Sequence, residues 1–258
     1  MYGICNLSVV PCRADSSNKS EQVSQLLFGE HFEIIEIQKS WIKIKMAYDN
    51  YECWIDQKQF QVISEETFKE LQSLPFHLTT DLVQIVVSKE NDQVFPILLG
   101  STLPYFDAEV CNLEGHEYGF EGSSVLPSQV ADKQKIIEFA YSYLNSPYLW
   151  GGRTPFGIDC SGFTQIVYKL AGEKLPRDAY QQAEYGQTLS FIEEAEPGDL
   201  AFFDNEEGKI IHVGIILEKN QIIHASGKVR IDFIDHYGIY NSDMKKYSHN
   251  LRLLKKIL

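Results

Sequence analysis

The sequence predicts an α+β protein, in which a β-rich first half precedes a domain of helices packed on one antiparallel sheet. Two observations support this prediction. Residues 1–125 consist largely of short apolar segments separated by polar turns, a spacing typical of small β-barrels. From residue 126 onwards, segments with helical periodicity are followed by runs rich in β-branched residues. With 258 residues, the chain is long enough for two or three domains.

Residues 1–62 are predicted to form the first barrel. In SWIKIKM, residues 40–46, isoleucine and methionine alternate with lysine, and the strand YECWID follows a turn. The segment SEETFKEL then predicts a short helix, because Ser64 precedes acidic residues in its first turn. β-like segments and turn signals continue to residue 125, so we assign residues 63–125 to a linker helix and a second barrel.

Residues 126–258 form the third predicted domain. The segment DKQKIIEFAYSYLN places apolar residues from Ile136 to Leu144 on one face of a helix that should pack against a sheet. A loop rich in glycine and proline follows. Apolar residues at helical spacing then predict a second helix over residues 160–171, closed by Gly172. Strands are expected in LAFF, IIHVGIIL, QIIHAS and NLRLLKKIL.

Cys160 is a candidate nucleophile because it lies in the first turn of the second helix. Asp159, directly before it, is a favourable N-cap residue. Unpaired N–H groups and the helix dipole stabilise an anion at this place, so the sequence predicts a lowered thiol pKa. A lone cysteine is more often an inert buried residue. We keep that interpretation for the other four cysteines: Cys5, Cys12, Cys53 and Cys111.

The proton acceptor for such a nucleophile is expected in residues 210–227. Two β-branched runs flank Glu218-Lys219-Asn220, which predicts a hairpin in which Leu217 faces Gln221. In this register His212 and His224 are diagonal neighbours on one face, whereas a two-residue loop would put them on opposite faces. His212 could then accept the thiol proton while His224 orients His212.

These residues resemble the NlpC family of papain-like cysteine endopeptidases, which cleave bacterial cell-wall peptides. The resemblance covers about the last half of the chain and rests on four strings in the same order: YxWGG, DCSGF, HVGI and a later HA. It implies a papain-like catalytic domain. The residues it assigns are Cys160 as nucleophile, His212 as base, His224 as third polar residue, Tyr148 in the pocket wall and Ser161 in substrate binding.

The first half resembles bacterial SH3-like domains in the strings S-W-I-K-I, Y-E-C-W-I and LLFGE. Members of the family often carry such domains, including a cytoplasmic peptide-recycling group with two. In that group an aspartate beside the nucleophile binds the free amine of a short peptide, so Asp159 is implied as both N-cap and amine ligand. Glu30 and Tyr51 of the first barrel are expected to line the same pocket. Carboxylates there would select a cationic peptide N-terminus.

Arg177, in LPRDA, is a further candidate substrate-binding residue. The family commonly has serine or threonine shortly after this arginine, but Asp178 and Ala179 follow here, so no hydroxyl contact is carried over. Arg177 could instead orient its loop by pairing with Asp178 or another acid, an ion pair worth little at a protein surface.

Composition excludes several classes of partner. The formal net charge of −13 argues against nucleic acids and anionic membranes. No apolar stretch is long enough to span a bilayer, and the N-terminus lacks the pattern of a secretory signal. Five widely spaced cysteines suit a reducing compartment. We therefore expect a cytoplasmic monomer without cofactor. A zinc site from Cys160, His212 and His224 is possible by residue type, but the helix start favours a free thiolate.

The resemblance implies a metal-independent cysteine endopeptidase that acts on short, released peptidoglycan peptides with a free N-terminal L-alanine. It would cleave the bond between γ-D-glutamate and the following diamino acid, either lysine or diaminopimelate. Two alternatives remain. A thiol acyltransferase would use the same geometry and is favoured by an open hydrophobic groove. A non-catalytic protein that binds cell-wall fragments is disfavoured by the complete set Cys160, His212 and His224.

Overall fold

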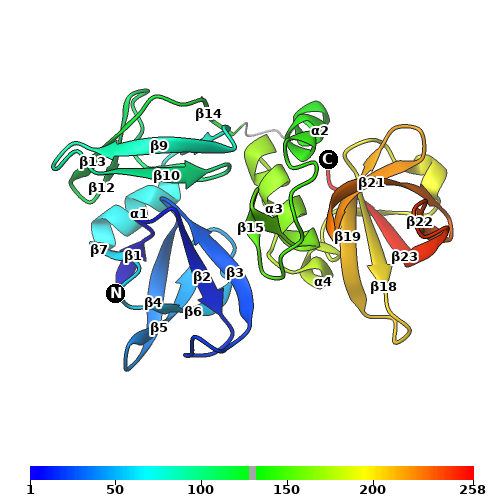
Figure 1. Ribbon diagram of the computed structural model, residues 1–258, viewed down its shortest axis with the longest axis horizontal. Helices are drawn as coiled ribbons and strands as arrows, with labels where there is room; N and C mark the ends of the chain where they lie inside the picture. The colour runs from blue at the N-terminus through cyan, green and yellow to red at the C-terminus, as the bar shows by residue number, and fades with distance from the viewer. Residues whose placement is uncertain (128–131) are drawn as a thin grey trace. The chain divides into compact units, whose positions relative to one another are not determined.

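The computed structural model describes residues 1–127 and 132–258, and the chain divides into two compact units, Met1–Pro127 and Ser128–Leu258 (Figure 1). The first unit contains mostly strands, as expected from its alternating segments. The second contains three α-helices among its described residues and a seven-stranded sheet. Within the described residues, none of the helices has the length and apolar character that a bilayer crossing requires.

The first unit begins with a seven-stranded antiparallel sheet in the order β3-β2-β6-β5-β4-β1-β7. Alternation along β5 explains its formation, because Ile42, Ile44 and Met46 are buried in the core while the lysines between them are partly exposed. The strands are β1 (Tyr2–Ile4), β2 (Val9–Arg13), β3 (Gln22–Leu27), β4 (His31–Gln38), β5 (Trp41–Met46), β6 (Glu52–Asp56) and β7 (Gln61–Ile63).

The helix α1 (Glu65–Ser73) follows, and the hydroxyl of Ser64 caps it by accepting from the N–H of Thr67. Two further sheets complete the unit, in the orders β10-β9-β13-β12 and β11-β8-β14. Their strands are β8 (His77–Thr79), β9 (Val83–Ser88), β10 (Val94–Leu98), β11 (Thr102–Leu103), β12 (Val110–Leu113), β13 (His116–Phe120) and β14 (Ser124–Val125).

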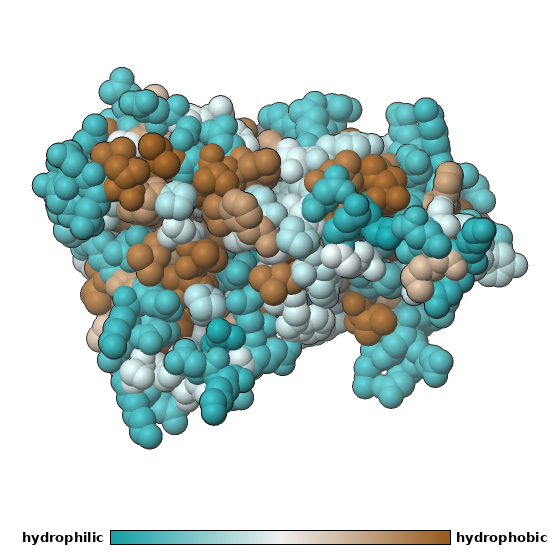
Figure 2. Space-filling model, in the orientation of Figure 1, coloured by the Kyte–Doolittle hydropathy of each residue, from teal (hydrophilic) through white to brown (hydrophobic). Residues whose placement is uncertain are grey.

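One core joins the two parts of the first unit. Phe28 and Ile63, from the first part, pack in the same cluster as Val86 and Phe120, from the second. The opposite face of β9 and β10 carries exposed apolar side chains such as Ile85 and Val94, and Figure 2 shows apolar patches over this region. These strands therefore bury one face and expose the other, as period-two alternation requires.

In the second unit, two of the three described α-helices pack against the antiparallel sheet β17-β23-β18-β19-β20-β21-β22, in which β23 also pairs with β22 (Figure 1). The remaining helix, Lys133–Ser142, was expected to pack against the sheet but packs against the helix Cys160–Ala171 instead. The helices are α2 (Lys133–Ser142), α3 (Cys160–Ala171) and α4 (Ala179–Gln182), with a 3-10 turn at Ile192–Glu194. The strands are β15 (Arg153–Thr154), β16 (Gly157–Ile158), β17 (Gln187–Leu189), β18 (Leu200–Asp204), β19 (Ile210–Leu217), β20 (Gln221–Ser226), β21 (Lys228–Asp235), β22 (Gly238–Asn241) and β23 (Lys246–Lys256).

The predicted apolar face of α2 is only partly correct. Asp132 caps the helix by accepting from the N–H of Gln134, and Ile136 and Ala140 are fully buried. The helix ends at Ser142, however, and Leu144 beyond it is 38% exposed. The apolar periodicity of this segment therefore continues past the point at which the backbone leaves the helix.

Candidate active site

The start of α3 fixes the position of the candidate nucleophile. Asp159 caps the helix, with its Oδ1 accepting from the N–H of Gly162 at 2.7 Å, and Gly172 ends it in the left-handed region at φ 96°. Both boundaries agree with the prediction. The burial of α3 differs from the prediction. Only one apolar face was expected to be buried, but every residue of the helix is buried. Cys160 therefore begins a helix that lies inside the unit.

Two glycines let the preceding loop approach this helix closely. A Cβ atom on Gly162 would lie 2.4 Å from the carbonyl oxygen of Gly152, and one on Gly152 would lie 2.3 Å from the carbonyl oxygen of Gly157. Neither position has room for a side chain without movement of the backbone. The glycines of WGG and DCSGF therefore bring the loop and the first turn of α3 into contact.

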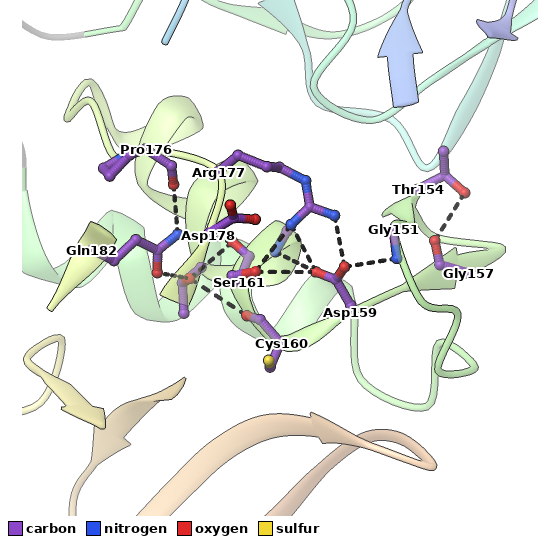
Figure 3. Close-up of polar contacts among 12 residues, drawn as sticks. Gly151, Thr154, Gly157, Asp159, Cys160, Ser161, Pro176, Arg177, Asp178 and Gln182 are labelled. Atoms are coloured by element: carbon purple, nitrogen blue, oxygen red, sulfur yellow. Dashed lines mark hydrogen bonds and ion pairs between the residues drawn. The ribbon is translucent and has the colours of Figure 1, made fainter. Parts of the chain in front are cut away.

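Behind Cys160, a buried ion pair ties α3 to the segment before α4 (Figure 3). Arg177 donates from Nη1 and Nη2 to the two oxygens of Asp159 at 3.0 and 2.6 Å, and Nη1 also lies 3.0 Å from Ser161 Oγ. The backbone N–H of Gly151 donates to Asp159 Oδ2 at 2.8 Å. With the helix cap and the Ser161 hydroxyl, which donates to Oδ1 at 3.4 Å, five donors surround this carboxylate. The prediction that Arg177 pairs with an acid is confirmed, but the expectation of a weak surface pair is wrong because both side chains are buried.

The thiol of Cys160 points away from this ion pair, towards the strands in the lower part of Figure 3. Backbone N–H groups of Val213, on β19, and of Ser161 are hydrogen-bonded to it. Burial and the negative charge of Asp159 nevertheless raise the pKa of the thiol to about 12. The predicted lowering of this pKa is therefore wrong, because desolvation outweighs the donors at the helix start.

The hairpin of β19 and β20 has the predicted register. Leu217 pairs with Gln221 and Gly214 with His224, and the loop residues Lys219 and Asn220 both adopt left-handed conformations. This register places the histidines on one face, where Nε2 of His212 lies 2.8 Å from Nδ1 of His224. Both imidazoles are buried. Burial lowers the pKa of each, and that of His212 falls well below its ordinary value, so both rings rest uncharged near neutral pH.

Asp232 extends the histidine pair and is not among the residues predicted from the sequence. Its Oδ2 lies 3.1 Å from Nε2 of His224, and its side chain is buried. Arg230 forms an ion pair with it, with Nε to Oδ2 at 2.6 Å and Nη2 to Oδ1 at 2.8 Å. The register of β20 and β21, with Ile222 opposite Asp232, makes Asp232 and His224 diagonal neighbours. The alternation of KVRIDFID after Gly227 could have revealed this pairing.

His249, on β23, also lies at the site, although no sequence pattern singles it out. Its ring stacks on that of His212 with a centroid distance of 4.1 Å, because β23 lies beside β18 and β18 beside β19. Burial lowers the pKa of His249 to about 4. We call His212, His224 and His249 the histidine cluster.

Among the described residues, the histidine cluster could offer ligands to a metal ion, since one nitrogen of each ring lies within 4.8 Å of the others. Two ligands of tetrahedral zinc lie about 3.4 Å apart when each is about 2.1 Å from the ion. The facing nitrogens of His212 and His224 are closer than this, at 2.8 Å, and bond to each other. A metal would have to break that hydrogen bond.

The other predicted residues fall in different places. Tyr148 lies near the nucleophile, since burial and then the charges of Cys160 and Asp159 raise the pKa of its phenol. Glu30 and Tyr51 belong to the first unit, where the N–H of Leu27 donates to Glu30 at 2.9 Å and Tyr51 packs on the core. Their role beside Cys160 therefore stays a prediction.

Comparisons with known proteins identify two domains in the chain. A model of the NlpC/P60 family matches residues 145–250, and a model described as the bacterial dipeptidyl-peptidase Sh3 domain matches residues 13–60. A γ-D-glutamyl-L-lysine dipeptidyl-peptidase of Bacillus cereus is 26% identical over 233 residues, covering 81% of this chain and 68% of the relative. Dipeptidyl-peptidase 6 of Lysinibacillus sphaericus is 25% identical over 255 residues, covering 90% and 91%.

A crystal structure of an NlpC/P60 family protein from Bacillus cereus has the same fold, with a TM-score of 0.84 and 18% identity over the whole of both chains. The matched segment 145–250 contains the Cys160 helix start and the hairpin that carries His212 and His224. The chain therefore carries an NlpC/P60 domain and, ahead of it, a bacterial dipeptidyl-peptidase SH3 domain.

Proposed function

We propose that the protein is a cysteine endopeptidase that hydrolyses the γ-D-glutamyl–diamino acid bond of short peptidoglycan peptides with a free N-terminal L-alanine. The observation that carries this proposal is the buried pair of His212 and His224 on the hairpin that supplies an N–H group to the thiol of Cys160. The name of the Bacillus cereus relative, a γ-D-glutamyl-L-lysine dipeptidyl-peptidase, supports the proposed bond.

The reaction begins from an uncharged site. As the sulfur of Cys160 attacks the carbonyl carbon, the thiol proton passes to His212. The carbon–nitrogen bond then breaks, and the proton on His212 moves to the leaving amine. Water attacks the thioester, gives a proton to His212 and releases the acid, after which the thiol is restored. The backbone N–H of Cys160, in the first turn of α3, is the proposed donor to the oxyanion.

Substrate recognition is proposed to involve residues around the helix start. Tyr148 would line the pocket beside the thiol, and Ser161 would bind substrate next to Arg177. Asp159 is proposed to attract the peptide amine, together with Glu30 and Tyr51 of the first barrel. Five donors already surround the Asp159 carboxylate, so it would act on an amine through its charge rather than through a free lone pair.

The finer architecture is part of this proposal. Residues 1–62 and 63–125 are proposed as two SH3-like barrels, the second with its linker helix, and residues 126–258 as a papain-like domain. The packing of α3 against β19 and β20 supports the papain-like arrangement. We also propose a cytoplasmic monomer without a cofactor, nucleic-acid or membrane partner, because the acidic balance and five widely spaced cysteines suit such a protein.

The test is hydrolysis of L-Ala-γ-D-Glu-L-Lys and of the corresponding diaminopimelate peptide, followed by mass spectrometry. Wild-type protein should release L-Ala-γ-D-Glu, and Cys160→Ala should release none. An N-acetylated peptide should not be cleaved if the enzyme recognises the free N-terminal amine. Transfer of the dipeptide to an added amine without hydrolysis would support the acyltransferase alternative instead. Binding without either reaction would support a non-catalytic protein.

A further inference from the structure

The carboxylate of Asp232 lies at the end of a buried chain of side chains that leads to the candidate base. Its Oδ2 is 3.1 Å from Nε2 of His224, and Nδ1 of His224 is 2.8 Å from Nε2 of His212. The exposed fractions of His212, His224 and Asp232 are 5%, 1% and 5%. Solvent therefore has little access to the hydrogens along this chain.

A carboxylate can only accept hydrogen bonds, and this decides where each proton lies. Burial raises the pKa of Asp232, but hydrogen bonds from His224 and Arg230 outweigh burial and leave the pKa below its ordinary value. Asp232 is therefore ionised near neutral pH, and Nε2 of His224 must carry a hydrogen. Because the ring is neutral, its Nδ1 has a lone pair and accepts from Nε2 of His212. The remaining nitrogen of His212, Nδ1, is then the one without a hydrogen.

The charged groups around this chain support the same assignment. Arg230 contacts both oxygens of Asp232 and is itself held by Asp243, so a permanent cation keeps the carboxylate ionised. His249 stacks on His212 and stays neutral, so it supplies no competing charge.

We propose that Asp232 is a positioning residue, which fixes the tautomer of His224 and through it that of His212, so that Nδ1 of His212 is the proton acceptor for Cys160. This inference rests on the proposed thiol chemistry and adds a residue outside the matched sequence strings. Asp232 does not contact the reacting atoms. Its role is to prevent the reversed chain, in which Nδ1 of His212 would carry a hydrogen and could accept no proton from the thiol.

Asp232→Asn tests this role, because an amide can donate as well as accept. In the orientation that donates to Nε2 of His224, both imidazoles take the other tautomer and the base is blocked. We expect kcat for peptide hydrolysis to fall about 100-fold while KM changes less than about twofold. This loss is smaller than the one expected on removing a carboxylate that is hydrogen-bonded directly to the base. Asp235→Asn is the matched control. Asp235 lies on the same strand but bonds Tyr237 and Tyr247, so its loss should leave kcat unchanged.

A double-mutant cycle separates positioning from general support of the fold. If Asp232 acts through His224, then Asp232→Asn should cost little further activity in a His224→Gln background. Equal losses in the presence and absence of His224 would overturn the proposal. So would a wild-type rate in folded Asp232→Asn, with folding checked by thermal unfolding.

Nitrogen NMR of histidine-labelled wild-type protein gives a readout that needs neither a variant nor activity. The proposal requires a hydrogen on Nε2 and none on Nδ1 of both His212 and His224. The opposite tautomer in either ring would overturn it. If no peptide is cleaved but both rings show this tautomer, the positioning role stands and the proposed peptidase function fails.

Discussion

Removal of the Arg177 guanidinium is expected to destabilise the second unit strongly. Arg177 and Asp159 are only 2% and 8% exposed, and two hydrogen bonds of 3.0 and 2.6 Å join them. Arg177→Met keeps most of the aliphatic stem but leaves the Asp159 carboxylate buried without its cation. Breaking a buried pair in this way costs about 3–5 kcal/mol. For a unit of this size, the loss corresponds to a fall in Tm of about 10–20 °C.

The assay is thermal and urea unfolding of the full chain, followed by a signal from the second unit. Arg252→Met is the control, because the Arg252 side chain is 61% exposed and its Nε lies 3.6 Å from Asp204. An exposed pair of this kind is worth at most about 1 kcal/mol. Asp159→Asn combined with Arg177→Met should recover part of the loss, since the amide carries no charge and still caps α3. A change below about 1 kcal/mol for Arg177→Met would refute the reasoning.

Three further predictions follow from burial. The three histidines of the cluster have pKa values below that of an unfolded histidine, so protonation favours the unfolded chain. The free energy of unfolding should be highest above about pH 6.5 and should fall below that pH, by at most about 2 kcal/mol per histidine at pH 5. Urea midpoints that do not change with pH would contradict this prediction. Alkylation of Cys160 by iodoacetamide should be slow at pH 7 and rise with pH, whereas a plateau from acidic to neutral pH would show a thiolate in the resting site. Gly162→Ala should lower both Tm and peptide hydrolysis, because its Cβ would meet the Gly152 carbonyl, and unchanged values would show that the loop can move aside.

Local signals in the sequence were sufficient for the elements that hold the nucleophile and base. The N-cap at Asp159 and the C′ glycine at Gly172 depend on neighbouring residues alone, and both are where the sequence predicts them. The hairpin register depends on loop length and strand alternation, so His212 and His224 could be paired before the fold was known. Short-range sequence rules were therefore sufficient to predict the positions of Cys160, His212 and His224 on their elements.

The remaining features depend on contacts between distant segments. His249 reaches His212 through the order β23-β18-β19, and no periodicity in β23 itself indicates that neighbour. The pKa of Cys160 was predicted from the helix dipole, but the complete burial of α3 outweighs it. The sequence alone left several acidic residues as possible partners of Arg177, and the tertiary fold brings Asp159 to it.

The central claim is that Cys160 forms a covalent acyl-enzyme with the γ-D-glutamyl carbonyl. Acid-quenched intact mass spectrometry during turnover of L-Ala-γ-D-Glu-L-Lys tests it most directly, with peptide mapping of the labelled residue. We expect an added L-Ala-γ-D-Glu acyl group on Cys160 in the wild type and none in Cys160→Ala. Peptide cleavage by Cys160→Ala at the wild-type rate, or an acyl group on any other residue, would contradict the account.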